Sequence, residues 1–296
     1  MTKHVFGGDW TDDKLNLLAK YLMAYRTIFS KNPRARYFKT WYVDAFAGTG
    51  SRSTPDAALK PASLFQDVYD DAETKLYRDG SAQIALRLSS PFDRYFFIEK
   101  TKSRVDELRT TIEINHAKLF PRCIFKHGDA NDVLKTWCNE RDWGKERAVV
   151  FLDPYGMQVE WTTVKSLART RAIDVWYLFP LGVGVTRLLT RDGKIEESWQ
   201  NRLDLLFGTS EWRSRFYATQ TNTGLFGEQD FVRRNVTVEN IRGFINERLS
   251  SCFARVAKGK VLRNSKSSPL YLLCFAAANE RGAPKALKIA QDILKD

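Results

Sequence analysis

The sequence predicts an α/β protein whose mostly parallel sheet is covered by helices on both faces. Apolar strand segments alternate with amphipathic helical segments through residues 1–182, which is the pattern of right-handed βαβ crossovers. Near the C-terminus, two β-rich segments follow each other across a short turn, which predicts an antiparallel hairpin. With 296 residues, 43% of them hydrophobic, the chain is long enough for one decorated domain with a large core.

The first elements surround a glycine-rich turn. Thr11 precedes apolar residues at three- and four-residue spacing, and Asn32-Pro33 ends this pattern, so we expect an N-capped amphipathic helix. Residues 40–50, TWYVDAFAGTG, predict a buried strand that leads directly into the turn. Residues 51–78 are polar and include two prolines, which indicates a surface insertion before the helical pattern SAQIALRLSS.

The alternation is regular from residue 94 onward. We expect strands at residues 94–100, 122–129, 148–156 and 173–182, with helices near residues 103–116, 132–138 and 163–169 between them. Residues 183–254 contain no convincing strand, so we expect a mainly helical insertion that recognises a substrate or partner. Residues 1–182 and 255–296 then form the core, completed by a hairpin of FARVAKGKVLRN and SSPLYLLCFAAAN and by the helix PKALKIAQDILK.

Composition favours an anionic partner and argues against other classes of protein. The chain carries 47 Lys and Arg against 35 Asp and Glu, a net charge of +12, which favours nucleic acid as a partner. The four cysteines form no C-x-x-C pair and the three histidines have no ligand spacing, so we expect no metal site. The sequence shows neither a signal-peptide pattern nor a membrane-spanning apolar run, and a cytoplasmic protein with reduced thiols is expected.

A ligand is expected beyond the carboxyl ends of the parallel strands, where the strand-end residues meet. Gly48 and Gly50 allow a sharp turn and a close approach of the backbone to a ligand, although a simple tight turn would also use them. Glu99 is placed to accept hydrogen bonds from ribose hydroxyls, and Asp129 to contact an adenine amino group. Asn131 is a second polar candidate for this contact, and Asp129 or Asn131 would serve equally well as a helix N-cap.

The turn sequence separates the candidate nucleotide ligands. A dinucleotide fingerprint needs a third glycine where the chain has Ser53, and GTGSRS lacks the Lys-Ser/Thr of a P-loop. S-adenosylmethionine has no phosphate and needs only a close backbone approach, a carboxylate for the ribose and a pocket for adenine. We therefore expect it to contact the strand-end residues Asp44, Phe46, Ala47, Gly48, Gly50, Glu99, Lys100, Asp129 and Ala130.

The motifs DAFAGTG, FIEK, GDAND and FLDPYG, in this order, resemble those of Rossmann-like class I S-adenosylmethionine-dependent methyltransferases. Asp153-Pro154-Tyr155 resembles the D-P-P-Y motif of enzymes that methylate adenine N6 in nucleic acids. The chain has a single proline here, so its aromatic residue comes one position early. The resemblance implies a methyltransferase fold with Asp153, Pro154 and Tyr155 as the catalytic residues.

A larger part of the chain resembles the three-Cys-motif partner protein (TcmP) family. The similarity includes YVDAFAGTG, FLDPYGM, the long block at residues 173–208 and the terminal PLYLLCFAAAN. It implies a methyltransferase-like fold and a co-encoded partner, a radical-SAM-like protein that carries the three-cysteine motif. It implies no particular substrate.

The strand-end motif at Asp153 predicts a way to activate an amine. The exocyclic amine of adenine or cytosine is a weak nucleophile because its lone pair is delocalised into the ring. The Asp153 carboxylate and the Pro154 carbonyl would each accept an N–H, and Tyr155 would stack on a base held out of its helix or strand. Alternatively, Asp153 caps the following turn and Tyr155 only packs.

Basic residues are concentrated in the C-terminal half, where residues 160–296 carry a net charge of +8 against +4 for residues 1–159. This excess predicts a phosphate-binding rim, although a solvated surface is the alternative interpretation. Its expected members are Arg187, Arg191, Arg255, Lys258, Lys260, Arg263 and Lys266.

Three functions remain open. The sequence favours a nucleic-acid methyltransferase. A non-catalytic subunit that serves the three-Cys-motif protein is the second interpretation, and the shortened D-P-Y-G motif favours it. A small-molecule methyltransferase is the third, and the net charge of +12 disfavours it.

Overall fold

The computed structural model describes residues 9–49, 80–224 and 227–295. Within these ranges its centre is an eight-stranded sheet whose first five strands are parallel. These strands are β1 (Lys39–Asp44), β2 (Arg94–Glu99), β3 (Cys123–His127), β4 (Glu146–Leu152) and β5 (Ile173–Phe179). The order of these five strands along the sheet is β3-β2-β1-β4-β5, and three C-terminal strands extend the sheet beyond β5.

The C-terminal strands run against the parallel set, as predicted. β10 (Pro269–Ala277) is antiparallel to β5, and both β8 (Arg255–Val256) and β9 (Lys260–Arg263) are antiparallel to β10. From its third residue onward β10 is completely buried, because neighbouring strands cover its edges and helices cover its faces. This mixed sheet with its C-terminal hairpin is the Rossmann-like methyltransferase fold that the sequence predicts.

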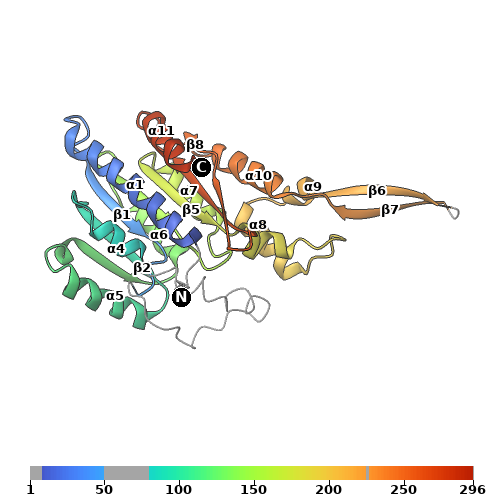
Figure 1. The fold of residues 1–296 in the computed structure, drawn as a ribbon, viewed down its shortest axis with the longest axis horizontal. Helices are drawn as coiled ribbons and strands as arrows, with labels where there is room; N and C mark the ends of the chain where they lie inside the picture. The colour runs from blue at the N-terminus through green and yellow to red at the C-terminus, as the bar shows by residue number, and fades with distance from the viewer. Residues whose placement is uncertain (1–8, 50–79, 225–226, 296) are drawn as a thin grey trace, which may run out of the picture.

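Helices cover both faces of the sheet (Figure 1). One face packs against α1 (Asp9–Lys31), α4 (Ser81–Leu86), α5 (Lys102–Asn115) and α11 (Ala283–Leu294). The other packs against α6 (Ala130–Asn139) and α7 (Trp161–Arg169), and a 3₁₀ turn, η2 (Phe120–Arg122), precedes β3. Alternation along β1 separates the two cores, because Trp41 and Val43 point to the α6 side and Tyr42 to the α1 side.

α1 lies along the sheet with its apolar side buried. The Tyr21 ring packs against Trp176 and Phe275, with ring centroids 5.2 and 5.0 Å away, and the Tyr21 hydroxyl donates to Asp174 at 2.7 Å. Asp174 lies at the start of β5, whereas Lys14 contacts the residue that follows β4. The first turns of α1 therefore lie at the carboxyl end of the parallel strands, and its later turns lie toward their amino end.

Residues 183–254 contain helices, as expected, together with strands that the sequence did not predict. Besides helices they contain a two-stranded hairpin of β6 (Tyr217–Gly224) and β7 (Gly227–Arg234). The expectation that this segment has no strand is wrong, because both strands are mostly polar in sequence and offer no apolar alternation to detect. The hairpin projects away from the sheet (Figure 1).

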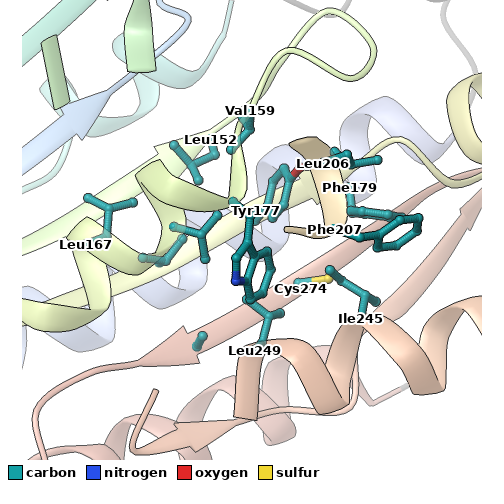
Figure 2. Packing of buried hydrophobic residues seen from close by; sticks show 14 of the residues in the cluster. Leu152, Val159, Leu167, Tyr177, Phe179, Leu206, Phe207, Ile245, Leu249 and Cys274 are labelled. Atoms are coloured by element: carbon teal, nitrogen blue, oxygen red, sulfur yellow. The ribbon is translucent and has the colours of Figure 1, made fainter. Parts of the chain in front are cut away.

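The helical part of this segment extends the core. A π-helical turn, η3 (Leu181–Thr186), leads from β5 to α8 (Glu197–Phe207), α9 (Trp212–Phe216) and α10 (Val238–Ser250). Phe207 and Leu249 lie in one buried cluster with Tyr177 of β5 (Figure 2). The base of the hairpin is fixed to this body, because the Arg234 N–H donates to the Arg191 carbonyl at 2.9 Å.

All four cysteines are free thiols, two of them buried and two half-buried. Within the described part of the chain, no group of three or more His, Cys, Asp or Glu side chains is arranged to hold a metal ion. Among the same residues, no helix combines the length and the apolar character needed to cross a membrane.

Candidate functional site

The candidate site lies where β1 and β4 end side by side. The chain adds β2 and β3 on one side of β1 and then β4 and β5 on the other, so the switch point falls between β1 and β4. In open α/β sheets, ligands bind at such a point, beyond the carboxyl ends of the strands. Gly50 and the insertion expected at residues 51–78 lie outside the described residues.

The turn after β1 folds over the end of β2. Gly48 has a φ of 60°, and its backbone N–H donates to Glu99 Oε2 at 3.2 Å. The Ala47 N–H donates to the Ile98 carbonyl at 3.0 Å, and Glu99 Oε1 accepts the Thr101 N–H at 2.9 Å. Backbone donors therefore hold both oxygens of Glu99, and the remaining lone pairs of its carboxylate can accept hydrogen bonds from a bound molecule.

Asp44 closes β1 but its side chain points into the protein, where it is fully buried. Its Oδ2 accepts the Ser81 hydroxyl at 2.6 Å and the Tyr42 hydroxyl at 3.4 Å, and its Oδ1 accepts the Phe46 N–H at 3.3 Å. Burial raises the pKa of Asp44 from 3.8 to about 6, and the negative charge of Asp153 adds to the rise. Asp44 thus supports the glycine turn from the interior.

Asp153 forms an ion pair that the sequence reasoning missed. Lys14 of α1 donates from Nζ to Asp153 Oδ2 at 2.7 Å, and the side chains of the two residues are 0% and 7% exposed. Lys14 shares the buried side of α1 with Leu18 and Tyr21, four and seven residues further on. The position of Lys14 could have indicated a buried ion pair, because a lysine on the apolar side of a helix needs a buried partner.

The Asp-Pro-Tyr-Gly segment makes a tight turn after β4. Pro154 is buried, and the Tyr155 N–H donates to Gln158 Oε1 at 2.9 Å. Gly156 has a φ of 71°, a conformation that favours glycine. Tyr155 is half-buried as a residue.

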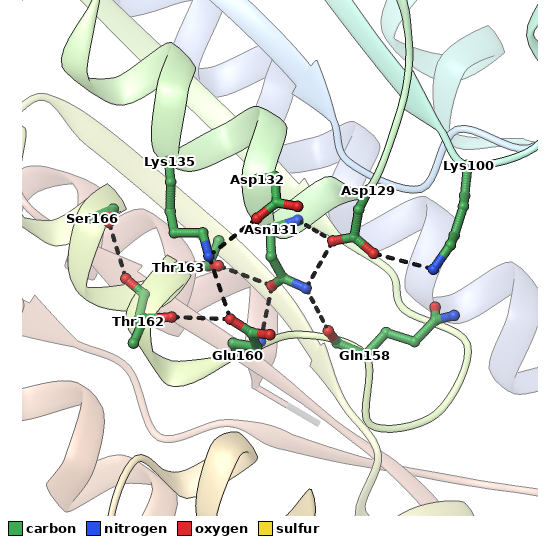
Figure 3. Close-up of polar contacts among 10 residues, drawn as sticks. All are labelled: Lys100, Asp129, Asn131, Asp132, Lys135, Gln158, Glu160, Thr162, Thr163 and Ser166. Atoms are coloured by element: carbon green, nitrogen blue, oxygen red, sulfur yellow. Dashed lines mark hydrogen bonds and ion pairs between the residues drawn. The ribbon is translucent and has the colours of Figure 1, made fainter.

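At the end of β3, Asp129 caps α6 (Figure 3). Its Oδ1 accepts the Asn131 N–H at 2.9 Å, and Lys100 Nζ donates to its Oδ2 at 3.3 Å. Burial alone would raise the pKa of Asp129, but the hydrogen bonds from Asn131 and Lys100 outweigh it and lower the pKa. The N-cap interpretation is confirmed, and Ala130 is buried as the first residue of the helix.

Asn131 joins α6 to the segment after β4 (Figure 3). Its Oδ1 accepts the Glu160 N–H at 3.0 Å and the Thr163 hydroxyl at 2.9 Å. Its Nδ2 donates to the Gln158 carbonyl at 2.9 Å and to Asp129 Oδ1 at 3.1 Å. These bonds use all four hydrogen-bonding positions of the amide, which leaves none for an adenine ring.

The basic residues expected to form one rim lie at two ends of the sheet. Arg263 and Lys266 flank the turn into β10, which begins opposite the end of β5 and so lies on the side of the candidate site. Arg255 pairs with Ala277, the last residue of β10, at the level where β5 begins. Arg255 therefore lies at the far end of the sheet from the candidate site.

The other four basic residues divide between the hairpin region and β9. Arg187 and Arg191 are exposed after η3, and Arg191 lies against the base of the β6–β7 hairpin. Lys258 is exposed before β9, and Lys260 is half-buried at its first position. The structure thus brings Arg263 and Lys266 together at the carboxyl end but does not assemble all seven residues into one surface.

No family model matches the chain, and no curated protein matches it in sequence. Solved structures with a similar arrangement include a methyltransferase from Geobacter sulfurreducens, with 14% identity, a TM-score of 0.31 and coverage of 73% of this chain and 78% of that chain. Trm1 from Pyrococcus horikoshii, solved with S-adenosyl-L-methionine, has 10% identity, a TM-score of 0.34 and coverage of 89% and 64%. An O-methyltransferase from Bacillus cereus, solved with SAH, has 16% identity, a TM-score of 0.31 and coverage of 74% and 80%. The fold assignment rests on the sheet order and strand directions described above.

Proposed function

We propose that the protein is a methyltransferase that uses S-adenosylmethionine and acts on an exocyclic amine of a nucleobase in RNA or DNA. The observation that carries this proposal is the arrangement of four acidic residues, Asp44, Glu99, Asp129 and Asp153, at neighbouring strand ends around the glycine turn. A site rich in carboxylates favours a nucleoside with a positive charge and repels one with phosphates. S-adenosylmethionine is a nucleoside of this kind.

The described residues fit the parts of this cofactor. Gly48 carries no side chain at the turn, so the backbone can approach a ligand closely. Glu99 would accept hydrogen bonds from the ribose hydroxyls, and Lys100 and Asp129 would border the adenine. Phe46 and Ala47 form the part of the turn that precedes Gly48. When bound, the cofactor supplies an activated methyl group, and the chain's contribution is to bind and orient the reactants.

The residues after β4 would receive the target base. The amine nitrogen forms a bond to the methyl carbon as the carbon–sulfur bond breaks, and the nitrogen then loses a proton to solvent. Positive charge develops on the nitrogen during this step, so the Asp153 carboxylate and the Pro154 carbonyl would stabilise it by accepting its N–H groups. Tyr155, which directly follows Pro154, would stack on the base.

A nucleic-acid substrate is supported by the net charge of +12 and by Arg263 and Lys266 at the site end of the sheet. In our proposal residues 183–254 recognise the substrate or a partner, because their hairpin projects from the body (Figure 1). Membership of the TcmP family, a co-encoded three-Cys-motif protein as partner and a cytoplasmic location belong to the same proposal.

A non-catalytic subunit is the second candidate function. Two observations favour it: Lys14 already occupies one oxygen of Asp153, and Asp-Pro-Tyr-Gly lacks the second proline of the amino-methyltransferase motif. In this case the fold would bind the cofactor without transferring its methyl group alone.

Calorimetry with S-adenosylmethionine, followed by tritiated methyl transfer to total RNA and to DNA, tests the proposal. We expect binding, transfer that weakens steeply with salt, and loss of transfer in Asp153→Ala with binding retained. Binding without transfer, or transfer only with the co-encoded protein, would favour the subunit. Transfer to small molecules that is insensitive to salt would contradict a nucleic-acid substrate. If S-adenosylmethionine does not bind, the proposal that the protein is a methyltransferase is refuted.

A further inference from the structure

Lys14 is a buried cation whose partner belongs to the candidate catalytic motif. Its Nζ lies 2.7 Å from Asp153 Oδ2 and 5.0 Å from the centre of the Phe151 ring. Removing an ammonium group from water costs several kcal/mol, and a nearby carboxylate repays this cost only in part. An apolar residue would fit the buried side of α1 at lower cost, so the pair needs an explanation other than stability.

Asp153 and Asp44 lie on the same face of the sheet. Asp44 pairs in register with Phe151 of β4, and Asp153 follows Phe151 by two residues. Because side chains alternate along a strand, both carboxylates point toward the face that α1 covers. Lys14 extends from α1 toward this face, and its Nζ donates to Asp153.

The two carboxylates differ in how they are held. Asp44 is bound by Ser81, Tyr42 and the Phe46 backbone, which together contact both of its oxygens. Asp153 is held through Oδ2 by Lys14, and its Oδ1 makes no hydrogen bond to any residue in the described ranges. One oxygen of Asp153 is thus fixed by α1, and the other can accept a hydrogen bond from a ligand.

We propose that Lys14 is a positioning residue: it holds the Asp153 carboxylate in a fixed orientation, so that Oδ1 is presented to the amine of the target base. The inference rests on the proposed function and adds to it a residue from the N-terminal helix. Lys14 touches neither reactant and acts through Asp153. It serves the chemical step, in which positive charge develops on the nitrogen, and not the binding of the cofactor.

A cycle of variants tests this inference: Lys14→Met, Asp153→Asn and the double variant, with Lys20→Met, an exposed lysine on the same helix, as the matched control. We expect Lys14→Met to lower kcat for methyl transfer by about 10- to 100-fold while the KM for S-adenosylmethionine changes by less than about 2-fold. In the Asp153→Asn background the same change should cost less than about 3-fold, because residues that act as one unit are not additive. Lys20→Met should behave as the wild type.

An undiminished kcat in Lys14→Met, or an equal loss with and without Asp153, would overturn the inference and leave Lys14 with a structural role alone. If Lys14→Met does not fold, Lys14→Gln replaces it in the same cycle, because the shorter glutamine side chain removes the charge but is still polar and carries N–H donors. Failure of the proposed function can be distinguished from failure of this inference alone, because the wild type itself would then transfer no methyl group. In that case the inference is refuted as well.

Discussion

Replacing Asp174 by asparagine is expected to remove a pH-dependent loss of stability. Asp174 lies at the start of β5 beneath α1, is 8% exposed, and accepts the Tyr21 hydroxyl at 2.7 Å. Burial raises the pKa of Asp174 from 3.8 to about 7, and the Tyr21 hydrogen bond and the Arg147 charge lower it in part. The fold therefore favours the neutral carboxyl.

The direction of the pH effect follows from proton linkage. Between about pH 4 and pH 7 the folded state holds more protons at Asp174 than the unfolded state, so the free energy of unfolding falls as pH rises through this range. The shift corresponds to roughly 4 kcal/mol, at about 1.4 kcal/mol per pH unit. Asp44, with a pKa of about 6, acts in the same direction. The contribution of Asp174 to the pH dependence of the free energy of unfolding is therefore measured as the difference between the wild type and Asp174→Asn.

Urea unfolding of the wild type and Asp174→Asn at pH 5 and pH 8 measures this contribution. Asparagine can still accept the Tyr21 hydroxyl, so we expect the variant to be more stable than the wild type at pH 8 by about 2–4 kcal/mol, with a smaller difference at pH 5. The control Asp142→Asn changes an exposed carboxylate and should alter neither value. The same pH dependence in the wild type and in Asp174→Asn would refute the reasoning.

Three further predictions concern the site and its surroundings. Gly48→Ala places a Cβ at a φ of 60° and should destabilise the fold by about 1–2 kcal/mol in urea unfolding, whereas no change would show that the turn relaxes. Asn131→Ala removes four hydrogen bonds and should cost about 2–4 kcal/mol by the same measurement; a cost below about 1 kcal/mol would mean that water replaces them. Replacing both Arg263 and Lys266 by alanine should weaken nucleic-acid binding in a salt titration and reduce its salt dependence, while Arg255→Ala, at the far end of the sheet, should not; an equal effect of Arg255 would contradict this division of the rim.

The sequence predicted those features that follow from short-range patterns. The strands β1, β4 and β5 are compact apolar runs, so their existence and order could be derived, and the glycine turn and the acidic strand ends came with them. The β6–β7 hairpin was missed because the sequences of its two strands offer no apolar alternation. The split of the basic residues was missed because β8 and β9 run in the same direction along β10, so that Arg255 pairs with its last residue and Arg263 with its first.

The contacts of Lys14 were missed for a different reason. Its partner Asp153 is 139 residues away in sequence, and only the docking of α1 on the sheet brings them together. The lysine on the apolar side of the helix was visible, but its partner was not. Ser81 and Gln158 are similar cases, because a single hydroxyl or amide gives no pattern until the backbone around it is placed.

The packing of α1 also determines when this protein can complete its folding. Tyr21 in the first element contacts Phe275 in β10, so the helix that is synthesised first must wait for almost the whole chain before its partners exist. Contacts of such long sequence separation slow folding and keep apolar surfaces exposed during synthesis. The aromatic side of α1 is therefore complete only when β10, near the end of the chain, supplies Phe275.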